Sequence, residues 1–252
     1  MTDAYLRLPF TFDVCRLQRD LQRLQAHHWQ QHINKQAHDG GWTALSLRAV
    51  DGNPDTIAVV EMDPGHYADT PYMRECSYIP EVLATLECQQ ASARLMSLRA
   101  GEEIRRHTDM DLGFEDGCVR LHIPIQTSTD VIFHIDDQPI HFGAGECWYM
   151  NANYPHQVSN SGDQDRIHLV IDCVVNDWLS TLFKETGYQK RVIHHKYGDP
   201  GISDTNVQQV IEQLEATATE AGLVIANRLR TIQQRDTTHA RLKPTPEGAV
   251  AK

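Results

Sequence analysis

The middle of the chain, residues 93–175, is a succession of short runs in which apolar and polar residues alternate. The runs are ARLMSLRA, CVRLHIPIQ, DVIFHID, QPIHF, ECWYMN and RIHLVIDCVV, and turn-forming segments such as AGEE, FEDG, FGAGE and NSGDQD separate them. Alternation with a period of two is typical of strands that bury one face. Many short strands with regular turns predict a sandwich or barrel of the jelly-roll kind, not a parallel sheet with crossover helices.

Helices and one further strand are expected before this region. From Phe12 to about Gln36 apolar residues recur at helical intervals and Asp13 can cap the first turn, which predicts one amphipathic helix. Residues 40–50, GGWTALSLRAV, alternate as a strand does, residues 63–77 predict an ordered loop, and IPEVLATLE predicts a short helix. We therefore expect residues 1–178 to form a mainly β domain with an amino-terminal helix.

Helical periodicity returns after Asn176, which is a suitable cap for a short helix in NDWLSTLFKETG. Residues 204–235 then predict a long helix, because apolar residues recur in steps of three or four. The stripe comprises Val207, Ile211, Leu214, Ala218, Ala221, Ile225 and Leu229. Such a stripe packs either against the protein's own core or against a partner subunit. A homo-oligomer formed through this helix is therefore one of two alternatives. We expect a helical region over residues 179–240 and a disordered tail over residues 241–252.

Composition and charge exclude several classes of protein. The 252 residues include 23 Lys plus Arg against 34 Asp plus Glu, and the formal net charge of -11 without a basic cluster makes nucleic acid an unexpected partner. Residues 1–20 lack the pattern of a signal peptide and no stretch has the length to span a bilayer, so we expect a cytoplasmic protein without membrane contact. The six cysteines form no C-x-x-C pair, which predicts free and mostly buried thiols.

The segment IRRHTDMDLG, residues 104–113, places a histidine and an acid at alternate positions. In an extended segment His107 and Asp109 point the same way, so the imidazole and the carboxylate can bind one metal ion. With 14 histidines in the chain, a chance pair on a solvated surface is the alternative. Asp111 is a rival ligand, but the spacing of two residues favours Asp109.

Two arginines are expected to face the interior of the sandwich. In RIHLVIDCVV the residues Ile167, Leu169 and Ile171 form an apolar face, which leaves Arg166 on the opposite, inward face. The run VRLHIPI likewise places Arg120 and His122 opposite an apolar face. Buried arginines need an anion, and their guanidinium groups match carboxylates, so this pattern predicts a cavity for a small anionic molecule. The alternatives are an ion pair of Arg166 with Asp172 or Asp165, and a core role for His122.

The segments GEEIRRHTD, VRLHIPIQT, GECWYMNANYPHQVSNSG and RIHLVIDCVV together resemble the aspartyl/asparaginyl β-hydroxylase family, whose smaller bacterial members include cis-4-proline hydroxylases. The resemblance covers about residues 93–178 and implies a double-stranded β-helix, a cupin-like jelly roll. It implies that His107, Asp109 and His156 bind Fe(II). It also implies that Arg166, ten positions after His156, pairs with 2-oxoglutarate, and that Arg120 and His122 line the same pocket.

The activity that this resemblance implies is hydroxylation of a small amino acid or a similar compound, with dioxygen as a further co-substrate and succinate as a product. Asp109 makes the chain more similar to the free-amino-acid hydroxylases, and it argues against a halogenase, which needs that position vacant. Hydroxylation of an aspartyl or asparaginyl residue in a peptide, a cupin isomerase or lyase, and a non-catalytic metal- or ligand-binding module are the alternatives. The candidates for substrate recognition are Arg48, Trp42, Tyr67 and Arg74.

Overall fold

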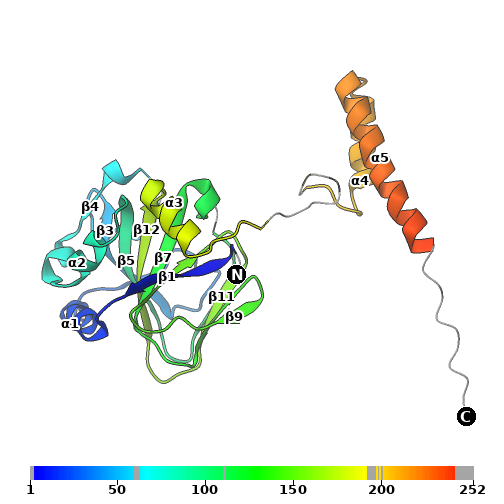
Figure 1. Ribbon diagram of the computed structural model, residues 1–252. Helices are drawn as coiled ribbons and strands as arrows, with labels where there is room; N and C mark the ends of the chain where they lie inside the picture. The colour runs from blue at the N-terminus through cyan, green and yellow to red at the C-terminus, as the bar shows by residue number, and fades with distance from the viewer. Residues whose placement is uncertain are drawn as a thin grey trace, which may run out of the picture. The chain divides into compact units, whose positions relative to one another are not determined.

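The computed structural model describes residues 3–59, 63–109, 112–191, 197, 199 and 201–241 (Figure 1). Contacts divide the chain into two compact units, residues 1–191 and residues 192–252. In the first unit the strands are β1 Tyr5–Thr11, β2 Gln30–Gln31, β3 Trp42–Val50, β4 Tyr67–Asp69, β5 Gln90–Leu98, β6 Glu103–His107, β7 Cys118–Gln126, β8 Val131–Ile135, β9 Gln138–Ile140, β10 Glu146–Met150, β11 His156–Asn160 and β12 Arg166–Val174. Its helices are α1 Val14–Leu24, α2 Ile79–Ala84 and α3 Asp177–Glu185, with 3-10 turns η1 Pro64–His66, η2 Pro71–Glu75 and η3 Phe114–Asp116.

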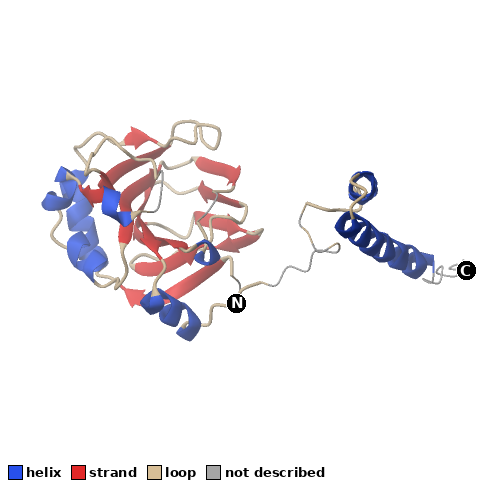
Figure 2. Cartoon of the chain, turned by 90° about the horizontal axis from the view of Figure 1, so that it is seen from above, coloured by secondary structure: helices blue, strands red, loops and turns tan. Residues whose placement is uncertain are grey.

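Two antiparallel sheets form the first unit. The larger has eight strands in the order β1-β10-β7-β12-β5-β3-β2, with β4 paired to β3, and the smaller has four strands in the order β6-β11-β8-β9. Figure 2 shows these strands with the helices on their outside. The mainly β jelly-roll fold with flanking helices that the sequence predicts is confirmed.

The large sheet has two different faces. Leu121, Ile123 and Ile125 of β7 and the equivalent residues of β12 pack with the helices in one apolar core. The opposite face contributes Met96 and Val170 to a second core, which also contains residues of the small sheet. The alternation read from the sequence therefore assigned the two faces correctly.

The helix predicted from Phe12 to Gln36 is wrong in its second half. The Asp13 carboxylate accepts the Arg16 N–H at 3.0 Å, as expected of a cap, but α1 ends at Leu24. Beyond it, the short strand β2 pairs with Ala44 and Thr43 of β3, so backbone hydrogen bonds to a sheet edge replace those of a helix. Strand β1, which pairs with β10, was not expected from the sequence.

Helix α3 packs into the first apolar core through Leu179 and Phe183. The first compact unit therefore continues to residue 191, past the boundary expected after residue 178. Residues 63–77, expected as an ordered loop, contain the short elements η1, β4 and η2.

The single long helix expected over residues 204–235 is two helices, α4 Val207–Ala216 and α5 Glu220–Arg241. Ala218 has a φ of 51°, a left-handed conformation that ends α4, and the Thr219 hydroxyl then accepts the Gly222 N–H at 3.1 Å. Val207, Ile211 and Leu229 of the predicted stripe pack the two helices against each other, together with Ala226, which the stripe did not include. Ala218, Ala221 and Ile225 of the stripe are exposed. Of the expected disordered tail, residues 242–252 lie outside the described residues.

Two further expectations concern the whole described chain. Within the described ranges, no helix combines the length and apolarity needed to cross a bilayer. All six cysteines are free, and Cys76, Cys118, Cys147 and Cys173 are buried, as the sequence predicts.

A buried carboxylate joins α1 to the beginning of α2. Asp20 is fully buried and accepts hydrogen bonds of 2.7–3.0 Å from the backbone N–H groups of Ser77, Tyr78 and Ile79 and from the Ser77 hydroxyl. Burial alone would raise the pKa of Asp20, but the backbone donors lower it to below its ordinary value. The carboxylate therefore contributes to stability in its ionised form.

We expect Asp20→Asn to lower the free energy of unfolding at pH 7 by about 3 kcal/mol, because buried N–H donors lose a charged acceptor. The stabilisation is complete above the unfolded aspartate pKa of about 4 and is lost as the pH falls through the lower folded pKa. Urea denaturation at pH 7 and pH 3 measures both effects, with Asp13→Asn as an exposed capping control. An equal difference between wild type and variant at the two pH values would contradict this account.

Candidate metal centre

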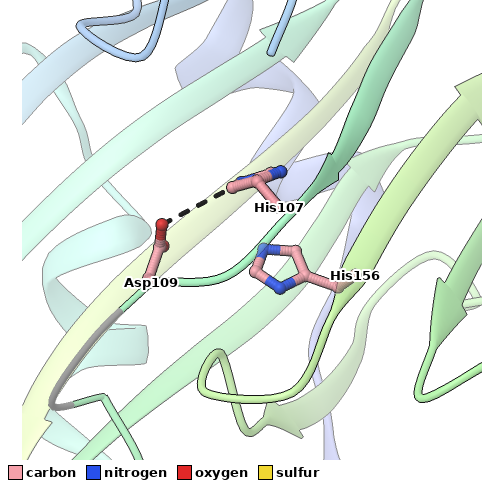
Figure 3. Close-up of side chains that lie close together, drawn as sticks. All are labelled: His107, Asp109 and His156. Carbon is pink, nitrogen blue, oxygen red and sulfur yellow. Dashed lines mark ion pairs between the residues drawn. The ribbon is translucent and has the colours of Figure 1, made fainter. Parts of the chain in front are cut away.

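Strand pairing brings the predicted metal ligands together. Strand β11 pairs with β6 so that His156 lies directly opposite His107, and Asp109 follows two residues after the end of β6. One ligand atom from each of the three residues lies within 4.8 Å of the others (Figure 3). Asp111, the rival ligand, lies outside the described residues.

Hydrogen bonds orient both imidazole rings. The Nδ1 atom of His107 lies 2.8 Å from the carbonyl oxygen of Arg105, and that of His156 lies 2.9 Å from the carbonyl oxygen of Tyr154. Because a carbonyl only accepts, each Nδ1 carries the proton and each Nε2 presents a lone pair. The buried Nε2 of His107 has no hydrogen-bond partner, which fits a metal ligand.

The electrostatics keep His156 and Asp109 in the protonation states that a metal requires. Burial lowers the pKa of His156 to about 4, so the ring is neutral at pH 7. Burial alone would raise the pKa of Asp109, but Arg120 and the two histidines hold it below its ordinary value. Two neutral imidazoles and one carboxylate are the donor set of mononuclear Fe(II) centres that keep coordination positions open.

Arg120 bridges the metal cluster and a second buried carboxylate. Its NH1 donates to Asp109 Oδ2 at 2.6 Å and its Nε donates to Asp172 Oδ1 at 2.7 Å. Asp172 also accepts the Ser92 hydroxyl at 2.6 Å and pairs with Arg94. Arg120 lines the cavity as expected, but two protein carboxylates already pair with its guanidinium group.

Arg166 has a different environment. It is 2% exposed, its Nε has no hydrogen-bond partner, and burial lowers its pKa to about 9, so it remains charged at pH 7. The alternative ion pairs do not form, because Asp172 pairs with Arg94 and Arg120, and Asp165 accepts the Ala100 N–H at 2.9 Å. A buried cation without a carboxylate partner among the described residues fits an anionic ligand.

His122 lies beside this arginine in the cavity wall. Its Nε2 is buried without a partner, and its Nδ1 lies 3.4 Å from Nδ1 of His168, a fully buried residue outside the metal cluster. Burial, with Arg120 and Arg166 nearby, holds the pKa of His122 well below its ordinary value. His122 therefore lies in the cavity wall as a neutral ring that bonds a core histidine.

The cavity between the sheets has a volume of about 30 Å³. Of the four candidates for substrate recognition only Trp42 lines it, and the indole Nε1 is buried without a hydrogen-bond partner. Arg48 instead pairs with Asp69 and donates to backbone carbonyls, and neither Tyr67 nor Arg74 lines the cavity. The remaining lining residues are Met96, Ile104, His107, Asp109, Arg120, His122, Phe133, Met150, His156, Val158 and Arg166.

The roles of Arg94 and Ser92 were missed in the sequence. Both lie on the inward face of β5, and the alternation of ARLMSLRA could have placed Arg94 there. The sequence indicated Asp172 only as an alternative ion-pair partner of Arg166.

The sequence matches known proteins across the sandwich. The family model of aspartyl/asparaginyl β-hydroxylases matches residues 12–175. Over 163 residues, 64% of this chain, the sequence is 28% identical to L-proline cis-4-hydroxylase of Rhizobium meliloti (strain 1021) and 24% identical to L-proline cis-3-hydroxylase 1 of a Streptomyces species. The match spans 57% and 56% of the length of these two relatives. Among solved structures, the non-haem α-ketoglutarate-dependent epimerase SnoN from nogalamycin biosynthesis is similar with a TM-score of 0.46 and 14% identity, over 80% of this chain and 92% of that one.

We expect Asp109→Ala and His156→Ala to weaken binding of a divalent metal by roughly 100-fold or more, since even changes to groups that only orient ligands cost 10–100-fold. Metal content after dialysis against Fe(II) or Co(II), measured by plasma mass spectrometry, tests this. His28→Ala removes an exposed histidine outside the cluster and is the control. Wild-type metal content in both cluster variants would exclude these residues as ligands.

Proposed function

The chain belongs to the aspartyl/asparaginyl β-hydroxylase family, and from that premise we propose an Fe(II)- and 2-oxoglutarate-dependent dioxygenase that hydroxylates a small amino acid or an amino-acid-like compound. The observation that carries the proposal is the pairing of a two-histidine, one-carboxylate cluster with the buried, carboxylate-free Arg166 in one cavity. Neither feature alone requires a 2-oxoglutarate enzyme, because a cupin isomerase also binds a metal but has no need of the arginine.

Different residues of this chain bind the metal, bind the co-substrate and exclude water in the proposed reaction. His107, Asp109 and His156 hold the metal through one atom each, which leaves coordination positions for the co-substrates. Arg166, with His122 beside it, binds the far carboxylate of 2-oxoglutarate. When bound, Fe(II) and 2-oxoglutarate supply the oxidation, in which 2-oxoglutarate and dioxygen yield succinate, carbon dioxide and a hydroxylated substrate. The apolar wall formed by Phe133, Met150 and other residues excludes bulk water.

The charge of the buried site supports a substrate with a carboxylate. Arg94, Arg120 and Arg166 are three cations, and Asp109 and Asp172 are two anions, which leaves one positive charge. An Fe(II) ion and a 2-oxoglutarate dianion cancel each other and leave this excess unchanged. Every free amino acid presents a carboxylate that can approach this charge, and the two similar hydroxylases are L-proline hydroxylases.

The first experiment is succinate formation by the purified protein with Fe(II), ascorbate, 2-oxoglutarate and dioxygen. Separate reactions contain each free amino acid, acylated amino acids, or short peptides with an aspartyl or asparaginyl residue. We expect one free amino acid or derivative to stimulate turnover and to gain the mass of one oxygen atom. Stimulation by the peptides alone would move the proposal to a peptidyl substrate. No binding of 2-oxoglutarate to the metal-loaded protein would contradict the proposal and favour a metal-binding module.

We expect Arg166→Ala to retain the metal but to raise the 2-oxoglutarate concentration for half-maximal turnover by roughly 10- to 100-fold, the effect of losing a charge-assisted hydrogen bond. Titration of the metal-loaded protein with 2-oxoglutarate measures this. Arg48→Ala, which removes an arginine that pairs outside the cavity, should leave the titration unchanged. An unaltered titration in Arg166→Ala would exclude Arg166 as the binding residue.

A further inference from the structure

Asp172 pairs with two buried arginines, Arg94 and Arg120, beside the metal cluster. Strand β12 lies between β7 and β5, and its register places Asp172 opposite Arg120 on one side and opposite Ser92 on the other. One carboxylate oxygen, Oδ1, accepts the Arg120 Nε, and the other, Oδ2, accepts the Ser92 hydroxyl and the Arg94 guanidinium. Asp172 itself has no exposed surface and does not line the cavity.

The guanidinium group of Arg120 is held from two sides. Its Nε donates to Asp172 and its NH1 donates to Asp109 Oδ2. The pair of Arg120 with Asp109 therefore has a single hydrogen bond and is not bidentate. The second oxygen of Asp109, Oδ1, lies 3.9 Å from Nε2 of His107. One oxygen of the Asp109 carboxylate therefore pairs with Arg120, and the other lies toward His107. Figure 3 shows the pair of Asp109 with His107.

We propose that Asp172 is a positioning residue for the metal centre, which holds Arg120 so that Asp109 offers a single oxygen to the metal. The inference rests on the proposed function only in that the cluster binds a divalent metal. Without Asp172, Arg120 is free to form a bidentate pair with Asp109 and to compete with the metal for Oδ1. The buried cations also lose their shared counter-ion, and this uncompensated charge opposes a dication nearby.

The test follows Co(II) binding to the metal-free, full-length protein by visible absorption and circular dichroism. Asp172→Asn removes the carboxylate with almost no change in shape, and we expect the dissociation constant for Co(II) to rise roughly 10- to 100-fold, the usual effect of losing a group that orients a ligand. We also expect altered d–d bands, because the coordination by Asp109 changes.

Two further variants separate positioning from charge and from stability. Arg94→Met/Asp172→Asn removes one cation with one anion, so the buried charge is unchanged while Arg120 still lacks its restraint. We expect this double variant also to bind Co(II) more weakly and with altered bands, and it replaces the single variant if that protein does not fold. Asp20→Asn removes another fully buried carboxylate, away from the cavity, and should reduce stability without changing the constant or the bands.

Each outcome decides between the two proposals. Wild-type Co(II) affinity and bands in the double variant would overturn the positioning role of Asp172 and leave the proposed function intact. Absence of Co(II) binding by the wild-type protein would instead overturn the metal centre itself, and the positioning role with it. Weaker binding with altered bands in both Asp172 variants, together with native binding in Asp20→Asn, would establish the role.

Discussion

Burial of β5, β7 and β12 on both faces is the constraint on which the rest of the structure depends. These central strands pack one face against the helices and the other against the small sheet, so all their side chains except those at the strand ends are buried. The helix-facing side is mainly apolar, and burial of that area stabilises the sandwich. The opposite side carries Arg94, Arg120, Arg166 and Asp172, which must therefore find partners inside the protein or in a ligand.

Most of the buried charges have partners of opposite charge among the described residues, but Arg166 does not. The paired charges stabilise the fold, whereas the unpaired one indicates a binding site. Arg94, Arg120 and Asp172 neutralise one another across adjacent strands, and Asp109 completes the set. Arg166 pairs with no described carboxylate and has an unpartnered Nε. A fold that retains a buried cation without an anion sacrifices stability there, which is the usual sign of a binding site.

The small sheet contributes the histidines, and the connection after β6 contributes the acid. Because β6 and β11 pair antiparallel with His107 opposite His156, the two rings face one another with centroids 4.3 Å apart. Asp109 is fixed separately, by its own N–H to the carbonyl of Ala152 and by Arg120 of the large sheet. The cluster therefore joins the two sheets, and its geometry depends on how they pack.

The sequence by itself determined the strand-rich sandwich, the two faces of β7 and β12, the cap at Asp13 and the pairing of His107 with Asp109, because strand alternation and residue spacing are local properties. His156 joined this pair in the sequence only through the resemblance to the family, and the pairing of β11 with β6 brings it opposite His107. It could not give the end of α1 at Leu24 or the break between α4 and α5, since pairing with β3 and helix packing decide these. Only the tertiary structure joined Arg120 to Asp109 and Asp172, which lie 11 and 52 positions away. Strand alternation assigns each residue to a face, but the register between strands decides which buried charges meet.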